Sequence, residues 1–183
     1  MAAARRGDRR ALEDLLRLHY DRLHAVCRRM AGNEADGADA TQEALIAIVR
    51  GLPRFDGTSR FSTWAYRVAV NATLDELRRR GRRAAVDLDS VPPRALASPE
   101  GSTAERVDVD AALRRLPVEF RAAVVLRDLC GLDYAEIAEV LAIPPGTVRS
   151  RIARGRAALL PMLAPETAPG NPGPTDDRPT QRP

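Results

Sequence analysis

Two short helical segments around a tight break most constrain the fold of this chain. They lie in "LDYAEIAEVLAIPPGTVRSRIARGRAALL", residues 132–160. Apolar residues on both sides of the break recur at the three- and four-residue spacing of an α-helix. Pro144 and Pro145 end the break, and a proline is tolerated at the first helical position because that N–H has no intrahelical partner. The pattern predicts two helices that cross steeply around a short turn.

The residues around this turn match the requirements of a helix-turn-helix. Ala138 stands where the two helices touch, Ile143 fills the turn, and Val148 and Ile152 face back from the second helix. Ala142 holds a turn position that glycine often occupies. Either this alanine adopts a left-handed backbone, at a cost on the order of 1 kcal/mol, or the turn differs slightly.

The second helix carries arginine and no acidic residue. Arginine neutralises phosphate and also pairs bidentately with guanine, which contributes about 1–3 kcal/mol of discrimination per contact. The alternative is an arginine-rich face that only meets solvent. Together with the turn, the acid-free helix favours binding to duplex DNA. The predicted DNA contacts are Thr147, Arg149, Ser150, Arg151, Arg154 and Arg156.

Helical periodicity also dominates the N-terminal part, where it predicts helices near residues 11–30, 39–52 and 59–83. Asp36 or Asp39 is the expected N-cap of the second of these. The chain shows no strand alternation, so we expect an all-α fold. The predicted boundaries are a first domain over 8–83, an acidic, proline-containing linker over 84–107, a second domain over 108–163 and a disordered tail over 164–183.

Composition excludes several classes of protein. The chain has 183 residues and a formal net charge of +4. Cys27 and Cys130 have no cysteine or histidine at metal-ligand spacing, so we expect buried free thiols in a reducing cytoplasm and no metal or cofactor. No apolar run approaches the roughly 20 residues of a membrane span. His19 and His24 form no catalytic set, and no glycine-rich phosphate loop is present, so we expect no enzymatic activity.

Both halves of the chain resemble one family. "DATQEALIAIVRGLPRFDGTSRFSTWAYRVAVNATLDELRRRGR" resembles domain 2 of bacterial sigma factors of the two-domain, extracytoplasmic-function class. "LPVEFRAAVVLRDLCGLDYAEIAEVLAIPPGTVRSRIARGRAAL" resembles domain 4 of the same class. The resemblance implies a protein that binds core RNA polymerase, reads a minus-35 element as duplex and captures the melted minus-10 element as single strand. It also implies control by an anti-sigma factor.

The resemblance assigns roles to residues of the first domain. The helix around residues 39–52 would dock on core RNA polymerase through Asp39, Gln42, Glu43 and Ile46. The following segment would bind the minus-10 element through Arg60, Phe61, Trp64, Arg67, Asn71, Arg78, Arg79 and Arg80. Base stacking on Phe61 and Trp64 competes with a simpler interpretation, because their spacing also fits a helix that buries both rings in the core.

One alternative of another class stays open. A transcriptional regulator with the same helix-turn-helix would bind duplex DNA without entering RNA polymerase as a subunit. The two functions differ in whether promoter binding requires core polymerase.

Overall fold

The structure is a computed structural model that describes residues 1–86 and 104–163; the side chains of 84–86 and 104–108 are left out of the description. These residues form helices and no strand, which confirms the all-α class. The elements are α1 (Ala2–Arg5), α2 (Arg9–Ala31), α3 (Glu34–Gly51), η1 (Leu52–Arg54), α4 (Phe61–Val86), α5 (Ala104–Arg115), α6 (Val118–Val124), the π-helical η3 (Val125–Leu129), α7 (Tyr134–Leu141) and α8 (Pro145–Leu163).

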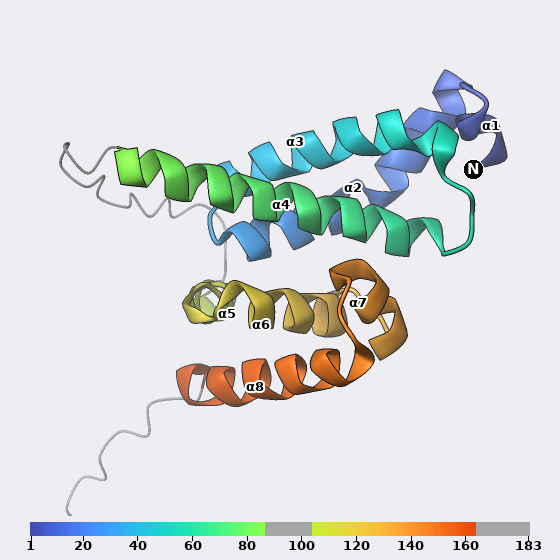
Figure 1. Ribbon diagram of the computed structural model, residues 1–183. Helices are drawn as coiled ribbons and strands as arrows, with labels where there is room; N and C mark the ends of the chain where they lie inside the picture. The colour runs from blue at the N-terminus through green and yellow to red at the C-terminus, as the bar shows by residue number, and fades with distance from the viewer. Residues whose placement is uncertain (87–103, 164–183) are drawn as a thin grey trace, which may run out of the picture.

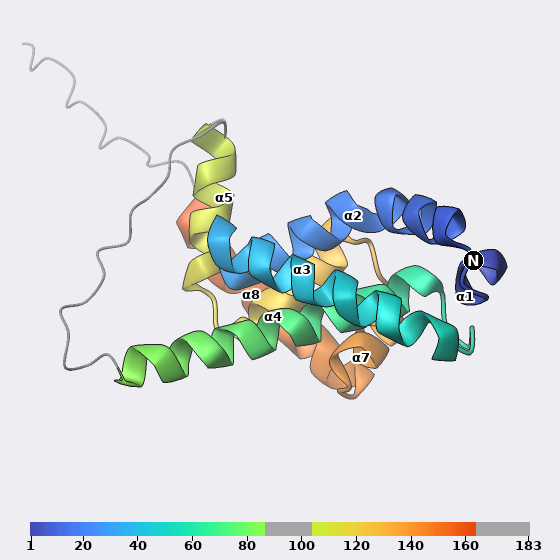
Figure 2. The same cartoon turned by 90° about the horizontal axis from the view of Figure 1, so that it is seen from above.

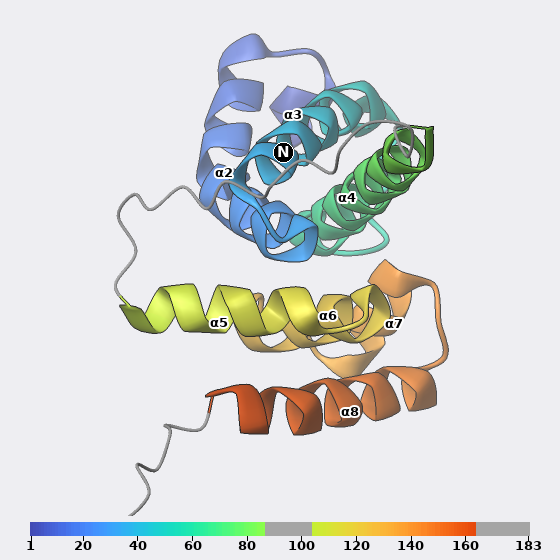
Figure 3. The same cartoon turned by 90° about the vertical axis from the view of Figure 1, so that its left-hand side faces the viewer.

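The helices form two layers. The long helices α2, α3 and α4 run side by side in one layer, with α5 to α8 packed beneath them (Figures 1 and 2). Figure 3 shows the layers edge-on, with α6 and α7 facing the upper helices and α8 on the far side. A single apolar core continues through both layers, from Met30 and Val70 above to Leu126 and Ile137 below. The N-terminal and C-terminal helices therefore share their hydrophobic interior.

Helix α2 begins and ends at residues that suit helix termini. The side chain of Asp8 accepts a hydrogen bond from the Ala11 amide at 3.0 Å and caps the N-terminus. Gly32 ends the helix with a φ of 85°, a conformation that glycine adopts without steric cost. Leu23 and Met30 are buried on the inner face of the helix.

The predicted N-caps of α3 are wrong. Asn33 caps this helix, because its side-chain oxygen accepts a hydrogen bond from the Asp36 amide at 2.8 Å. Asp36 and Asp39 already lie inside the helix. The left-handed turn at Gly32 lets the chain reverse immediately after α2, so α3 begins earlier than its apolar pattern indicates.

The predicted linker is shorter at both ends than expected. Helix α4 continues to Val86 and α5 begins at Ala104, whereas the linker was expected over 84–107. The remaining part, residues 87–103, and the predicted disordered tail over 164–183 lie outside the described residues.

Candidate nucleic-acid interface

The helix-turn-helix has the expected backbone. Helix α7 begins with a capping box in which Asp133 and Glu136 each accept a hydrogen bond from the other's backbone amide. It ends at Ala142, which adopts the left-handed conformation with φ 51° and ψ 46°. The Ile143 amide then donates to the Ala138 carbonyl at 3.1 Å and closes the turn. The left-handed alanine is thus confirmed, with its steric cost.

Helix α8 buries its apolar side and leaves its arginines outward. Val148 and Ile152 are 0% and 2% exposed, as the helix-turn-helix pattern predicts. Gly155 allows α8 to approach α6 closely, because a Cβ atom at this position would lie 2.6 Å from Val124 Cγ2. This packing sets the rotation of α8 and so decides which side chains face solvent.

The predicted DNA contacts of α8 fall into two groups. Arg149, Arg151 and Arg154 have no acidic partner within ion-pair distance among the residues that the structure describes. Arg156 instead forms a two-pronged ion pair with Asp128, in which Nε lies 3.2 Å from Oδ2. The remaining two residues bond to each other: Ser150 Oγ donates to the Thr147 carbonyl at 2.9 Å.

Tyr134 supports the arginine face, a role that the sequence analysis missed. The guanidinium carbons of Arg127 and Arg149 lie 5.2 and 5.8 Å from the centre of its ring, within the range of a cation–π contact. The available signal was an aromatic residue at the start of the first helix, next to the capping box. Its neighbourhood to Arg149 arises only when the turn brings the two helices together.

On α4, Arg60, Arg67 and Asn71 form a stripe that we name the α4 stripe. Their spacing of seven and four residues places them on one face of the helix. Asn71 is exposed, whereas Arg60 and Arg67 lie beside acids of α7. The sequence analysis did not foresee these acids.

Phe61 and Trp64 do not stand free beside this stripe. They pack against Phe55 in an aromatic cluster, with ring centres of Phe61 and Trp64 5.6 Å apart and those of Phe55 and Trp64 5.1 Å apart. Both are partly buried against the core. This packing favours the interpretation of the two rings as core residues.

The arginines at the end of α4 have acidic neighbours. Arg78 pairs with Asp75 at 2.8 Å, and Arg79 pairs with the buried Glu76 at 2.9 Å. Arg80 reaches across to Asp36 of α3 at 2.7 Å. These predicted minus-10 contacts are therefore also structural, because they neutralise acids within the upper layer.

The outer face of α3 carries the residues predicted to meet polymerase. Asp39, Gln42 and Glu43 are exposed and Ile46 is partly buried. Val49 joins them with 40% of its surface exposed, although the sequence analysis placed it on the inner face with Ile48. That placement was wrong because α3 packs against both α2 and α4, which leaves a narrower outer face that includes Val49.

Other chemistry is scarce among residues 1–86 and 104–163. This part of the chain contains no cluster of metal-ligating side chains and no helix able to span a membrane. Burial raises the pKa of the Cys27 thiol, and it raises the pKa of Cys130 to about 11. Both thiols stay protonated near neutral pH, which disfavours a redox role.

Comparisons with known proteins agree with this arrangement. The family model "Sigma-70 region 2" matches residues 15–83, and "Sigma-70, region 4" matches residues 106–159. The ECF RNA polymerase sigma factor SigM of Mycobacterium tuberculosis is 40% identical over 89% of this chain and 82% of its own length.

Two solved structures share the fold. The sigma factor RpoE of Bartonella quintana, in complex with the anti-sigma factor NepR, has a TM-score of 0.72 and 25% identity over 82% of this chain and 95% of its own. CnrH, in complex with the cytosolic domain of CnrY, has a TM-score of 0.66 and 27% identity over 88% of this chain and 93% of its own.

Proposed function

Because the chain belongs to the extracytoplasmic-function class of RNA polymerase sigma factors, which are non-enzymatic subunits of transcription initiation, we propose that it directs core polymerase to a two-part promoter. The observation that carries this proposal is the arginine face of α8 on a well-formed helix-turn-helix. Arg149, Arg151 and Arg154 point away from the core without acidic partners in the described residues. A helix of this kind reads the major groove of duplex DNA.

The minus-35 element is the proposed ligand of α8. Arg149 and Arg151 lie near the N-terminal end of the helix, which is the part of a recognition helix that contacts base edges. Arg154 follows on the same helix and suits a phosphate contact. Arg156, held by Asp128, is the weakest of the predicted contacts, since its charge is already compensated.

The minus-10 element is the proposed ligand of the α4 stripe. Arg60 and Arg67 provide donors for phosphate, and the exposed Asn71 provides an amide able to pair with an unstacked base edge. The packed rings of Phe61 and Trp64 support this surface from beneath in our proposal. The terminal arginines Arg78 to Arg80 add positive charge near the duplex.

Core RNA polymerase is the proposed partner of the outer face of α3. Asp39, Gln42, Glu43 and Ile46 combine acidic, amide and apolar groups on this face, and Val49 extends its apolar part. An anti-sigma factor is the proposed regulator, because RpoE and CnrH were each solved with one. These partners place the protein in the cytoplasm.

Run-off transcription tests the proposal. Purified bacterial core polymerase would be supplied with a genomic DNA library, with and without this protein. New transcripts that start at a shared two-part element support a sigma factor and reveal its promoter. If specific duplex fragments are instead retained by the protein without polymerase and no transcript appears, the alternative of a helix-turn-helix regulator is correct.

A further inference from the structure

Acidic residues of α7 lie against the α4 stripe. Glu136 Oε1 accepts a hydrogen bond from Thr63 at 3.3 Å and lies 3.9 Å from Arg60 Nη1. One turn further along α7, Glu139 Oε1 lies 4.0 Å from Arg67 Nη1. Figure 1 shows α7 directly beneath the N-terminal half of α4. The carboxylates thus stand where the proposed DNA contact needs phosphate oxygens.

These α4–α7 contacts are weak ones. The Arg60 side chain is 82% exposed, and Arg67 and Glu139 are each 42% exposed. Ion pairs at such distances and exposures contribute little and are screened by salt. A phosphate backbone can therefore displace them, which is a property required of an internal competitor.

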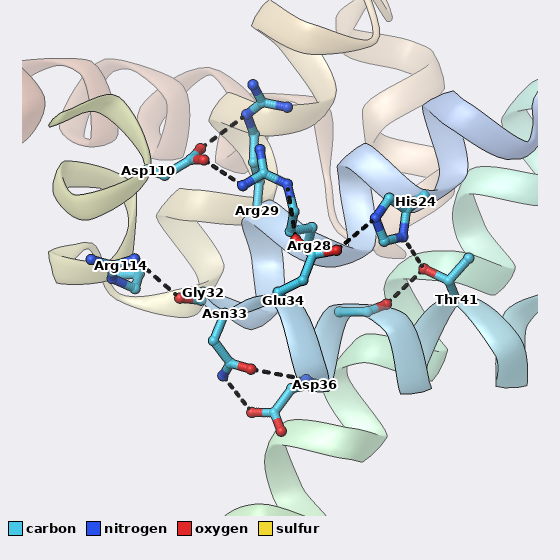
Figure 4. Close-up of polar contacts among 11 residues, drawn as sticks. His24, Arg28, Arg29, Gly32, Asn33, Glu34, Asp36, Thr41, Asp110 and Arg114 are labelled. Atoms are coloured by element: carbon cyan, nitrogen blue, oxygen red, sulfur yellow. Dashed lines mark hydrogen bonds and ion pairs between the residues drawn. The ribbon is translucent and has the colours of Figure 1, made fainter. Parts of the chain in front are cut away.

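The opposite end of the same interface is held more firmly. Asp110 of α5 lies 2.5 Å from Arg28 Nη1 and 3.3 Å from Arg29 Nε, and all three side chains are at most 30% exposed. Arg114 of α5 also donates to the Gly32 carbonyl at 3.4 Å. Figure 4 shows Asp110 between the two arginines of α2, with Arg114 beside Gly32.

We propose that the acidic face of α7 occupies the α4 stripe in the free chain and competes there with promoter DNA. The clamp of Asp110 on α2 keeps the layers together, so α7 stays at high local concentration beside α4. In this closed form the free protein captures single-stranded DNA poorly, and α7 must leave the stripe before Arg60 and Arg67 can bind phosphate. The inference rests on the proposed minus-10 role of the α4 stripe.

The test uses the full chain and a fluorescent pool of short, random-sequence single-stranded DNA. One variant is Glu136→Gln with Glu139→Gln, since glutamine keeps the hydrogen-bonding side of the capping box. A second is Asp110→Asn, which loosens the clamp without touching α4. The control, Asp14→Asn with Glu119→Gln, removes the same number of exposed acids away from the interface.

We expect the α7 double variant to bind the DNA about three- to tenfold more tightly than the control, as loss of two weak competing pairs implies. Asp110→Asn is expected to change affinity in the same direction. Equal affinity of the α7 variant and the control would overturn the inference. A gain in the α7 variant without any gain in Asp110→Asn would also overturn it, because a local charge effect would then replace opening of the layers.

Run-off transcription with core polymerase separates this inference from the proposed function. If the unaltered protein supports promoter-specific transcripts but the variants show no gain as free chains, only the internal competition fails. If the unaltered protein supports no transcript with core polymerase, the proposed function itself fails.

Discussion

The guanidinium of Arg121 donates a hydrogen bond to the Met30 carbonyl at 2.6 Å and so joins the lower layer to the C-terminal end of α2. The same side chain also donates to the Arg114 and Leu116 carbonyls, at 2.8 and 3.0 Å. Burial, followed by the positive charge of Arg114, lowers the pKa of Arg121. Backbone carbonyls at two helix ends thus stabilise a buried positive charge, since the negative end of a helix dipole favours a cation.

Replacing Arg121 tests the weight of this junction. We expect Arg121→Met to lower the free energy of unfolding by about 2–4 kcal/mol, because buried carbonyls lose a charged donor. Urea denaturation of the full chain measures the change. Arg115→Met is the control, since Arg115 is exposed on the neighbouring turn and should shift stability by less than about 0.5 kcal/mol. Equal effects of the two variants would contradict the prediction.

Gly37 marks the closest crossing of α2 and α3. A Cβ atom there would lie 2.6 Å from Arg28 Cα, a backbone atom that cannot move aside cheaply. We expect Gly37→Ala to destabilise the fold by about 1–3 kcal/mol. Gly81→Ala is the matched control, because a Cβ at Gly81 meets no atom within 4 Å and alanine favours an exposed helix by up to about 1 kcal/mol. Thermal unfolding should therefore move in opposite directions in the two variants.

The two groups of arginines on α8 should differ in their effect on promoter binding. Arg149→Ala should cost about 1–3 kcal/mol on the selected minus-35 duplex and reduce discrimination against random duplex. Arg156→Ala should cost less than about 1 kcal/mol, because Asp128 already compensates its charge. Fluorescence anisotropy on both duplexes measures the change. An equal loss on promoter and random DNA would reduce Arg149 to a phosphate contact.

Cys130 should react slowly until the solution is strongly alkaline. Burial raises its pKa from the ordinary 9.0 to about 11, so the folded chain keeps the proton longer than the unfolded chain. The stability that this thiol contributes is fully present below pH 9 and is lost as the pH rises toward 11. Alkylation followed by mass spectrometry should give a folded-state rate that still rises above pH 9, whereas the denatured chain levels off near that value.

Several local features were predictable because they depend on neighbouring residues. Helical spacing identified the helix-turn-helix, including the left-handed Ala142 and the buried Val148 and Ile152. Errors arose where one element met another. Val49 was assigned to the inner face because periodicity does not reveal how many helices pack around α3, and the cap at Asn33 was missed because its turn depends on the reversal at Gly32.

The sequence by itself determined the all-α class, the helix-turn-helix and the family resemblance, since spacing, turn chemistry and motif order are properties of contiguous residues. Only the tertiary structure decided which charges meet. Thr63 and Glu136 are 73 residues apart, and Met30 and Arg121 are 91 apart. No local periodicity links such positions, because their contact follows from how the two layers of helices pack over a shared apolar core.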